Sequence, residues 1–109
     1  MKINHETEIL DYSGEPIPNQ DGQPVTFRSV VISALNSLDP QLTAEKKVQA
    51  FQICMRMNPG KLLRLSLDEA KLVKDMAAKI TNALIYGRIC EILDPDSVES
   101  DDDEEEEDG

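Results

Sequence analysis

Several residue types that carry chemistry are scarce in this sequence. Its 109 residues include no tryptophan, one histidine, two cysteines and only 4% aromatic residues. His5 lies in a turn-rich segment, where we expect a surface residue rather than a general base. Cys54 and Cys90 do not suggest a disulfide framework, and because both lie in apolar helical segments we expect buried free thiols. The positions of these three residues match no zinc-site spacing.

Recognisable catalytic and cofactor motifs are also missing. The chain has no G-x-S-x-G sequence and no Cys–His nucleophile signature. It has no glycine-rich phosphate loop, and the fragment around Asp21 and Gly22 lacks the ligands of a calcium loop. We therefore expect a non-enzymatic protein with no catalytic residues, no cofactor and no metal ion.

Long apolar runs are absent as well. No stretch approaches the ~18 apolar residues of a membrane span. The first ten residues, MKINHETEIL, lack the apolar centre of a signal peptide. These features predict a cytoplasmic protein with no membrane contact.

The acidic charge of the chain is gathered in one place. The formal net charge is -11, and residues 94–109 hold eleven of the 22 acidic residues and no basic one. Residues 1–93 are therefore neutral overall. After Pro95 the chain has one valine and no aromatic residue, too little apolar area to offset the entropy cost of ordering. We expect a single small globular domain at 1–93 and a disordered acidic tail at 94–109.

The first half of the domain reads as turns followed by two helices. Glycines and prolines punctuate residues 1–25 and predict a short β-hairpin-like element. Thr26 is a suitable N-cap for a helix over 27–38, which Asp39-Pro40 ends. Thr43 is suited to cap a second helix over 44–58. Its apolar spacing predicts one face made of Val48, Phe51, Cys54 and Met55, with Ala44 nearby, and Ile53 and Met57 widen that face.

The second half reads as a connector and one long helical stretch. Residues 61–66 are either a short strand that pairs with the N-terminal one or a buried connector. Ser66 and Glu69 have the spacing of a capping box for a helix that continues to Leu93. Its apolar stripe rotates across 81–87, which predicts either a kink or two consecutive helices. The fold class expected is thus mainly α: a small N-terminal β element, three amphipathic helices with the last kinked or split, and the acidic tail.

Basic residues are concentrated in the window 46–79, which has a net charge of +5. We interpret this window as a solvated helical face; the alternative is a basic patch. Because Phe51 is the one aromatic residue in the window, stacking on bases is not indicated, and we do not expect direct nucleic-acid binding. The residues of the alternative patch are Lys46, Lys47, Arg56, Lys61, Arg64, Lys71, Lys74 and Lys79.

The acidic tail allows three interpretations. It is a solubilising brush, an intramolecular shield over the basic window, or a mimic of a phosphate backbone that occupies a groove on a partner. The second stripe of the last helix also allows two outcomes, namely packing against the N-terminal strands or a face left open to a homodimer or a protein partner. The predicted partner-binding residues are Ile85, Ile89, Ile92, Leu93, Asp101, Asp102, Asp103, Glu104, Glu105, Glu106, Glu107 and Asp108.

Four segments of the chain carry a resemblance. In DGQPVTFRSVVISALN, LTAEKKVQAFQICMRM, LSLDEAKLVKDMAAKI and ALIYGRICEIL, a G-x-P turn precedes a T-[LF]-[RG]-x-V helix start, and L-[ST]-x-E-x-K and L-[ST]-x-[DE]-[ED] starts follow. This order resembles small uncharacterised proteins of tailed bacteriophages and prophages over roughly residues 14–93. The resemblance implies a phage origin and a non-enzymatic role in particle assembly or on the host, and it brings no site residues.

Together these observations favour a protein-binding module. We expect it to engage a host protein, in a phage setting one that handles nucleic acid, through an apolar helical face and the acidic tail. The alternative is a morphogenesis accessory such as a tail-assembly chaperone, in which the apolar face shields a structural protein before it polymerises. Either protein would act in the cytoplasm of the host bacterium.

Overall fold

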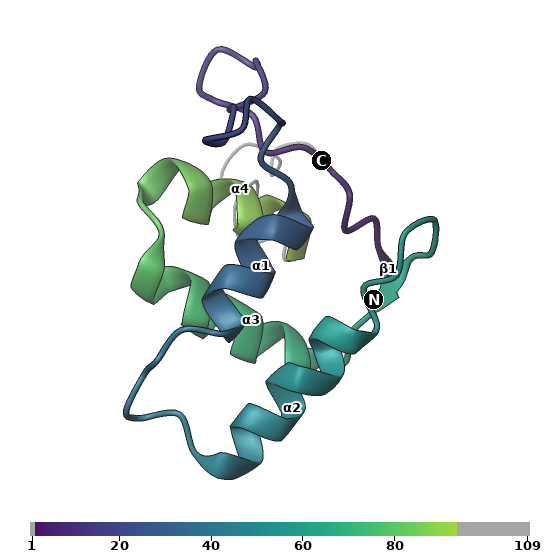
Figure 1. The fold of residues 1–109 in the computed structure, drawn as a ribbon, viewed down its shortest axis with the longest axis vertical. Coiled ribbons are helices and arrows are strands. Elements are labelled where there is room, and N and C mark those ends of the chain that lie inside the picture. Colours follow the sequence, from purple (N-terminus) through teal and green to yellow (C-terminus); the bar gives the residue numbers. More distant parts are fainter. Residues whose placement is uncertain (1, 94–109) are drawn as a thin grey trace, which may run out of the picture.

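The computed structural model describes residues 2–93 and is mainly helical, as the sequence predicts (Figure 1). The acidic residues 94–109, including the predicted partner-binding residues 101–108, lie outside this range. The elements in chain order are β1 (Lys2–Ile3), α1 (Phe27–Leu35), α2 (Ala44–Met55), β2 (Leu63–Arg64), α3 (Leu67–Ile80) and α4 (Ala83–Leu93).

Each of the three helix starts expected from capping residues is found. The Thr26 hydroxyl accepts a hydrogen bond from the Ser29 amide, and the Ser29 hydroxyl oxygen accepts one from the Thr26 amide. Thr43 caps α2 by accepting from the amide of Lys46. Ser66 and Glu69 form the predicted reciprocal capping box at α3. These bonds satisfy amides that have no partner inside the helix, and so fix where the helices begin.

A small β element joins the two halves of the chain. β1 pairs antiparallel with β2, with Lys2 opposite Arg64 and Ile3 opposite Leu63. Of the two alternatives for residues 61–66, the strand that pairs with the N-terminus is therefore confirmed. Residues 8–26 form the hairpin-like part, held by isolated bridges rather than a regular ladder. Gly14 and Gly22 lie at its turns with φ of +87° and +81°, a conformation that favours glycine.

The long helical stretch is split into α3 and α4, the second of the two predicted alternatives. Thr81 has extended backbone angles, φ -114° and ψ 158°, and its hydroxyl donates to the carbonyl oxygen of Ala77 at 2.6 Å. The side-chain oxygen of Asn82 accepts from the amide of Ile85 at 2.9 Å and so starts α4. Side chains that bond to the local backbone in this way compete with the helical ladder.

The core lies where α1 crosses α3, with α4 and α2 on either side. Phe27, Val31 and Ala34 of α1 are fully buried there. α1 ends at Leu35, earlier than predicted, because the Asn36 side chain donates to the carbonyl oxygen of Ile32 and closes the last turn. Leu38, expected on the buried stripe, is therefore fully exposed.

His5 is fully buried, so the prediction of a surface histidine is wrong. Its Nε2 lies 2.9 Å from the carbonyl oxygen of Asn58, and its own carbonyl oxygen accepts from the Arg28 amide at 2.7 Å. The pairing of β1 with β2 brings this N-terminal residue over the loop that follows α2. Burial here results from contacts between residues more than fifty positions apart, which local turn signals do not report.

Candidate functional site: an exposed apolar face on α2

Helix α2 has apolar residues on two opposite sides, and only one side is buried. Ala50, Ile53 and Met57, just after the helix, lie in the core. On the other side Val48, Phe51 and Met55 are 56%, 63% and 62% exposed, and Ala44 is exposed beside them. We call Ala44, Val48, Phe51 and Met55 the α2 face. Their spacing of four, three and four residues puts them on one stripe of the helix.

The buried side of α2 corrects a prediction from the sequence. Val48, Phe51 and Met55 fit a helical core stripe, but α1 and α3 both contact α2 on the side of Ala50 and Ile53. Because the two stripes lie on opposite sides of the helix, burying one exposes the other. A helix at the edge of a small fold has only one side that faces the core. Because α2 carries more apolar residues than one side can hold, this surplus could have identified the α2 face.

Polar residues border the α2 face. At 100° per residue, Lys47 lies on one flank of the stripe, and Glu45 and Gln52 lie on the other. A shallow depression beside Val48 is lined by Glu45, Lys46, Gln49 and Gln52. An apolar centre with a polar rim is the composition of a protein–protein interface.

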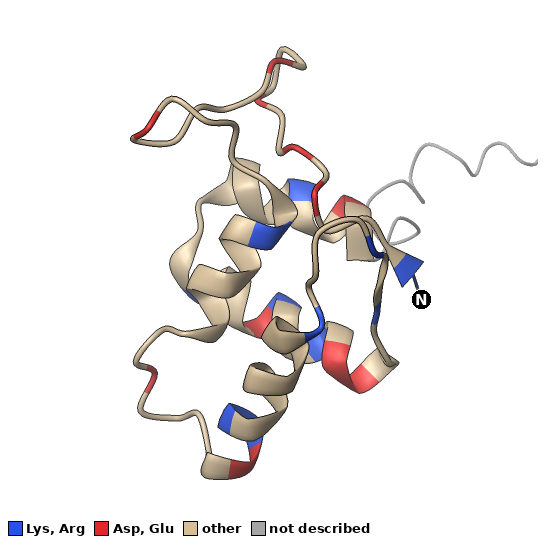
Figure 2. Cartoon of the chain, turned by 45° about the vertical axis from the view of Figure 1, so that its right-hand side comes forward, with Lys and Arg blue, Asp and Glu red and all other residues tan. Residues whose placement is uncertain are grey.

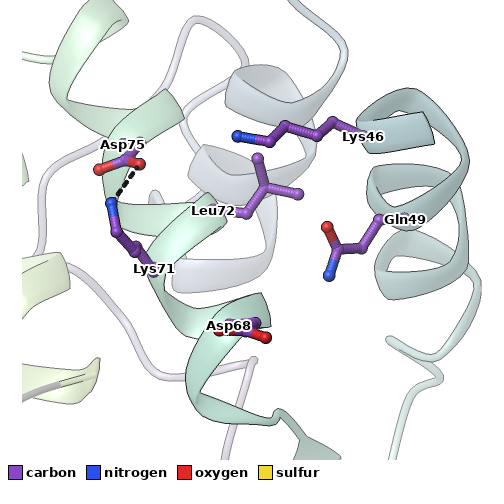
Figure 3. A pocket seen from close by; sticks show the side chains of 6 residues that line it. All are labelled: Lys46, Gln49, Asp68, Lys71, Leu72 and Asp75. Carbon is purple, nitrogen blue, oxygen red and sulfur yellow. Dashed lines mark hydrogen bonds and ion pairs between the residues drawn. The ribbon is translucent and has the colours of Figure 1, made fainter. Parts of the chain in front are cut away.

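A groove between α2 and α3 lies beyond this border, on the side of α2 that faces α3 (Figure 3). Lys46 and Gln49 of α2 face Asp68, Lys71, Leu72 and Asp75 of α3 across a space of about 260 Å³. Lys71 and Asp75 form an ion pair at 3.2 Å within α3. The groove therefore presents both signs of charge close together, a surface suited to polar contacts with a macromolecule rather than to one small anion or cation.

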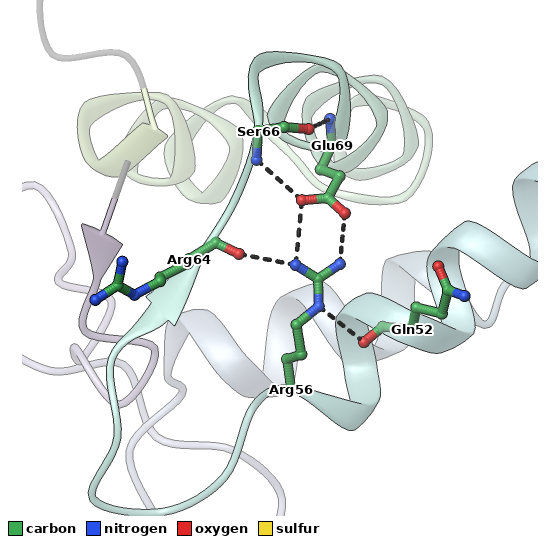
Figure 4. A network of polar contacts seen from close by, with 5 residues as sticks. All are labelled: Gln52, Arg56, Arg64, Ser66 and Glu69. Atoms are coloured by element: carbon green, nitrogen blue, oxygen red, sulfur yellow. Dashed lines mark hydrogen bonds and ion pairs between the residues drawn. The ribbon is translucent and has the colours of Figure 1, made fainter.

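Arg56 holds the end of α2 against the start of α3 (Figure 4). Its guanidinium forms a two-pronged ion pair with Glu69, with Nη1 3.2 Å from Oε1, and it also donates to the carbonyl oxygen of Arg64 at 3.0 Å. Glu69 in turn accepts from the Ser66 amide at 2.9 Å. The Arg56 guanidinium lowers the pKa of Glu69 below its usual value, and Glu69 raises the pKa of Arg56. This network fixes the orientation of α2, and with it the direction of the α2 face.

The predicted basic patch is interrupted by acidic partners. Besides Arg56, its members Lys71 and Lys79 form ion pairs, with Asp75 and Asp39 respectively. The contact with Lys79 lowers the pKa of Asp39. In each of α2, α3 and α4, Figure 2 shows Lys or Arg positions close along the helix to Asp or Glu positions. This arrangement matches the interpretation of the window as a solvated helical surface.

The predicted partner face on the last helix is mostly packed inside the chain. Ile89 and Leu93 belong to the core, with exposed fractions of 0% and 1%. Of the two outcomes left open for this stripe, packing inside the chain is the one found for them, so their assignment as partner-binding residues is wrong. Ile85 and Ile92 are half-buried against the same core. This helix packs against α3, and Arg88 of α4 donates to the carbonyl oxygens of Leu10 at 2.9 Å and Asp11 at 2.7 Å, which holds the N-terminal segment against α4 as well.

Both cysteines are free thiols, as expected. Cys90 is buried, whereas Cys54 is half-buried, and burial raises the pKa of the Cys54 thiol. A raised pKa leaves less of the nucleophilic thiolate at neutral pH. The Cys54 environment is therefore that of a structural residue.

Within residues 2–93 no group of three or more His, Cys, Asp or Glu is placed to hold a metal ion, and none of the helices described there could cross a membrane. Comparison of the chain with models of protein families, with curated proteins and with solved structures found no match.

Proposed function

We propose that this chain is a non-enzymatic protein-binding module that docks an apolar segment of its partner on the α2 face. The observation that carries the proposal is the direction of Val48, Phe51 and Met55, which point away from a core that α2 already contacts with its other side. Three large apolar side chains in one stripe on a surface helix are costly to leave in water, and such patches mark interaction sites.

The chemistry of the α2 face suits recognition of an amphipathic helix or an extended apolar segment. Phe51 supplies a rigid aromatic anchor of the type that dominates binding energy at interfaces. Met55 is flexible and polarizable, so it adapts to partners of different shape. The polar side chains that flank the stripe, Lys47, Glu45 and Gln52, can hydrogen-bond the rim of a partner.

The partner we infer is a host protein, in line with the resemblance to small phage proteins, acting in the bacterial cytoplasm. The acidic residues 101–108 add long-range attraction toward a basic surface, as on a protein that handles nucleic acid. Such attraction raises the association rate and weakens with salt, because the Debye length is about 8 Å at physiological ionic strength.

A tail-assembly chaperone is the second candidate. The same observation favours it: the α2 face is apolar and adaptable, and the chain folds with this face uncovered. In that role the α2 face would shield an apolar segment of a structural protein until assembly, and the acidic residues would maintain solubility.

Affinity capture with matched variants tests the proposal. Phe51→Glu should abolish capture of the partner from host or infected lysate, because it puts a charge at the centre of the α2 face. Leu38→Glu is the control, since Leu38 is fully exposed and lies outside the α2 face. Equal capture by both variants and the wild type would reject the α2 face as the docking surface.

The same experiment separates the two candidates and the role of the acidic residues. A captured structural protein of the phage particle favours the chaperone, whereas a host protein favours the host-directed module. Deletion of residues 95–109 should weaken capture and flatten its dependence on salt if those residues add electrostatic reach. Unchanged affinity and salt dependence would show that these residues act only to keep the protein soluble.

A further inference from the structure

We propose that the α2 face also binds the α2 face of a second copy, with the two helices antiparallel about a twofold axis midway between Val48 and Phe51. This inference shares with the proposed function the premise that the α2 face is a docking surface, but it does not depend on any partner. In a free protein the second copy would cover the exposed stripe, and a partner would compete with it.

The order of side-chain sizes along the stripe favours an antiparallel pair. In the antiparallel arrangement Val48 packs on Phe51 of the second copy, and Ala44 packs on Met55 of the second copy. Each layer then combines one large and one small side chain, which fills the space between helices evenly. The same two layers recur by symmetry, as a twofold interface requires.

A parallel pair fits less well. In a parallel pair each residue would pack on the equivalent residue of the second copy. Phe51 would then meet Phe51 and Met55 would meet Met55, while Ala44 would face Ala44 across a gap. Layers that alternate between overfilled and underfilled are destabilising, since both crowding and cavities cost free energy. The stripe therefore specifies orientation as well as association.

The flanking residues are compatible with the antiparallel pair. In antiparallel helices equivalent flanks face each other. Lys47 then lies near Cys54 of the second copy on one side, and Glu45 lies near Gln52 of the second copy on the other. No like charges are placed directly opposite, and the amide of Gln52 can donate to the carboxylate of Glu45. Both flanking charges, Glu45 and Lys47, are exposed and accessible.

The size of the face predicts a weak and reversible pair. α2 lies along one edge of the molecule, so a second copy can approach it (Figure 1). Three partly exposed side chains and one alanine provide much less than the about 800 Å² per partner of a standard interface. We expect a dissociation constant on the order of 0.1 mM, which a partner with a larger contact surface would displace.

Charge-exchange variants test the pairing and its orientation together. Sedimentation equilibrium of the full chain, up to about 1 mM, should show a monomer–dimer equilibrium. Val48→Lys and Phe51→Glu should each be monomeric, with at least a tenfold weaker association. A mixture of the two variants should associate again, because the introduced lysine of one copy then meets the introduced glutamate of the other, while the native Phe51–Val48 layer remains. Leu38→Lys, at a fully exposed position outside the α2 face, should dimerise like the wild type.

The inference would be overturned by a wild type that stays monomeric over this range, by a Leu38→Lys variant that loses dimerisation like the others, or by a mixture that fails to associate. Restored pairing between Val48→Lys and Val48→Glu instead would indicate a parallel pair and reject the arrangement proposed. Melting curves confirm that each variant is folded, as expected for substitutions at exposed sites. Failure of partner capture with an intact dimer would reject the proposed function and leave this pairing standing.

Discussion

Arg56 and Glu69 form a two-pronged ion pair that joins the end of α2 to the first turn of α3. The Glu69 side chain is 16% exposed, and the same carboxylate completes the α3 capping box. A single side chain thus supports both the start of one helix and the position of another.

Replacing Glu69 with Gln should destabilise the fold by about 1 kcal/mol, because it removes a charge-assisted pair in a partly screened position. Urea denaturation measures the change in the free energy of unfolding. Asp75→Asn is the matched control, since the side chains of the Lys71–Asp75 pair are 75% and 53% exposed and should contribute little. An equal effect of both substitutions would show that the Arg56–Glu69 network has no special role.

Stability should fall in acid. Glu69 and Asp39 both have a pKa lowered by a basic partner in the folded state, Arg56 and Lys79 respectively. Their contribution is therefore present above the unfolded pKa of about 4 and is lost as the pH falls through the lower folded values. Melting temperatures measured from pH 6 down to pH 2 should drop below about pH 4, and less steeply in Glu69→Gln. A wild type and a Glu69→Gln variant with parallel profiles would contradict this assignment.

His5 should support the junction between the N-terminus and the loop after α2. Its ring is fully buried and bonds Asn58 through Nε2, while Nδ1 is buried without a hydrogen-bond partner among the described residues. His5→Ala should cost about 2 kcal/mol from the cavity and the lost bond, and should speed hydrogen exchange at the amides of β1 and β2. Leu38→Ala should change neither quantity. Unaltered exchange in His5→Ala would show that the junction does not depend on the ring.

Truncating an apolar side chain should cost much more stability in the core than on the α2 face. Ile89→Ala should destabilise by about 2–4 kcal/mol, because Ile89 is fully buried in the core. Phe51→Ala should change the stability of the monomer by about 0.5 kcal/mol or less, since the ring is mostly exposed. Thermal unfolding at low protein concentration provides the comparison. A large loss of stability in Phe51→Ala would mean that the side chain contributes to the core.

The sequence predicts where the helices begin better than which of their faces is buried. Thr26, Thr43 and Ser66 mark helix starts because capping depends on neighbouring residues, and the break near Thr81 is equally local. The face that α2 buries depends on where α1 and α3 lie, and two apolar stripes leave that choice open. Burial of Ile89 depends in turn on how α4 packs against the rest of the chain, α3 above all.

The sequence alone therefore points to the wrong helix for the open apolar face. Apolar periodicity identifies residues that avoid water, but it does not distinguish burial in the core from exposure toward a partner. Phe51 is exposed and Ile89 is buried, the reverse of what the sequence indicates. Only the packing of the whole chain decides which of the two is buried.

The central claim is that the α2 face is a docking surface, and site-specific photocrosslinking in lysate tests it most directly. A photoreactive residue in place of Phe51 should form covalent adducts with a partner, with a second copy of the chain, or with both. The same residue in place of the fully exposed Leu38 should form few. Similar adducts from both positions, or none from position 51, would contradict the claim.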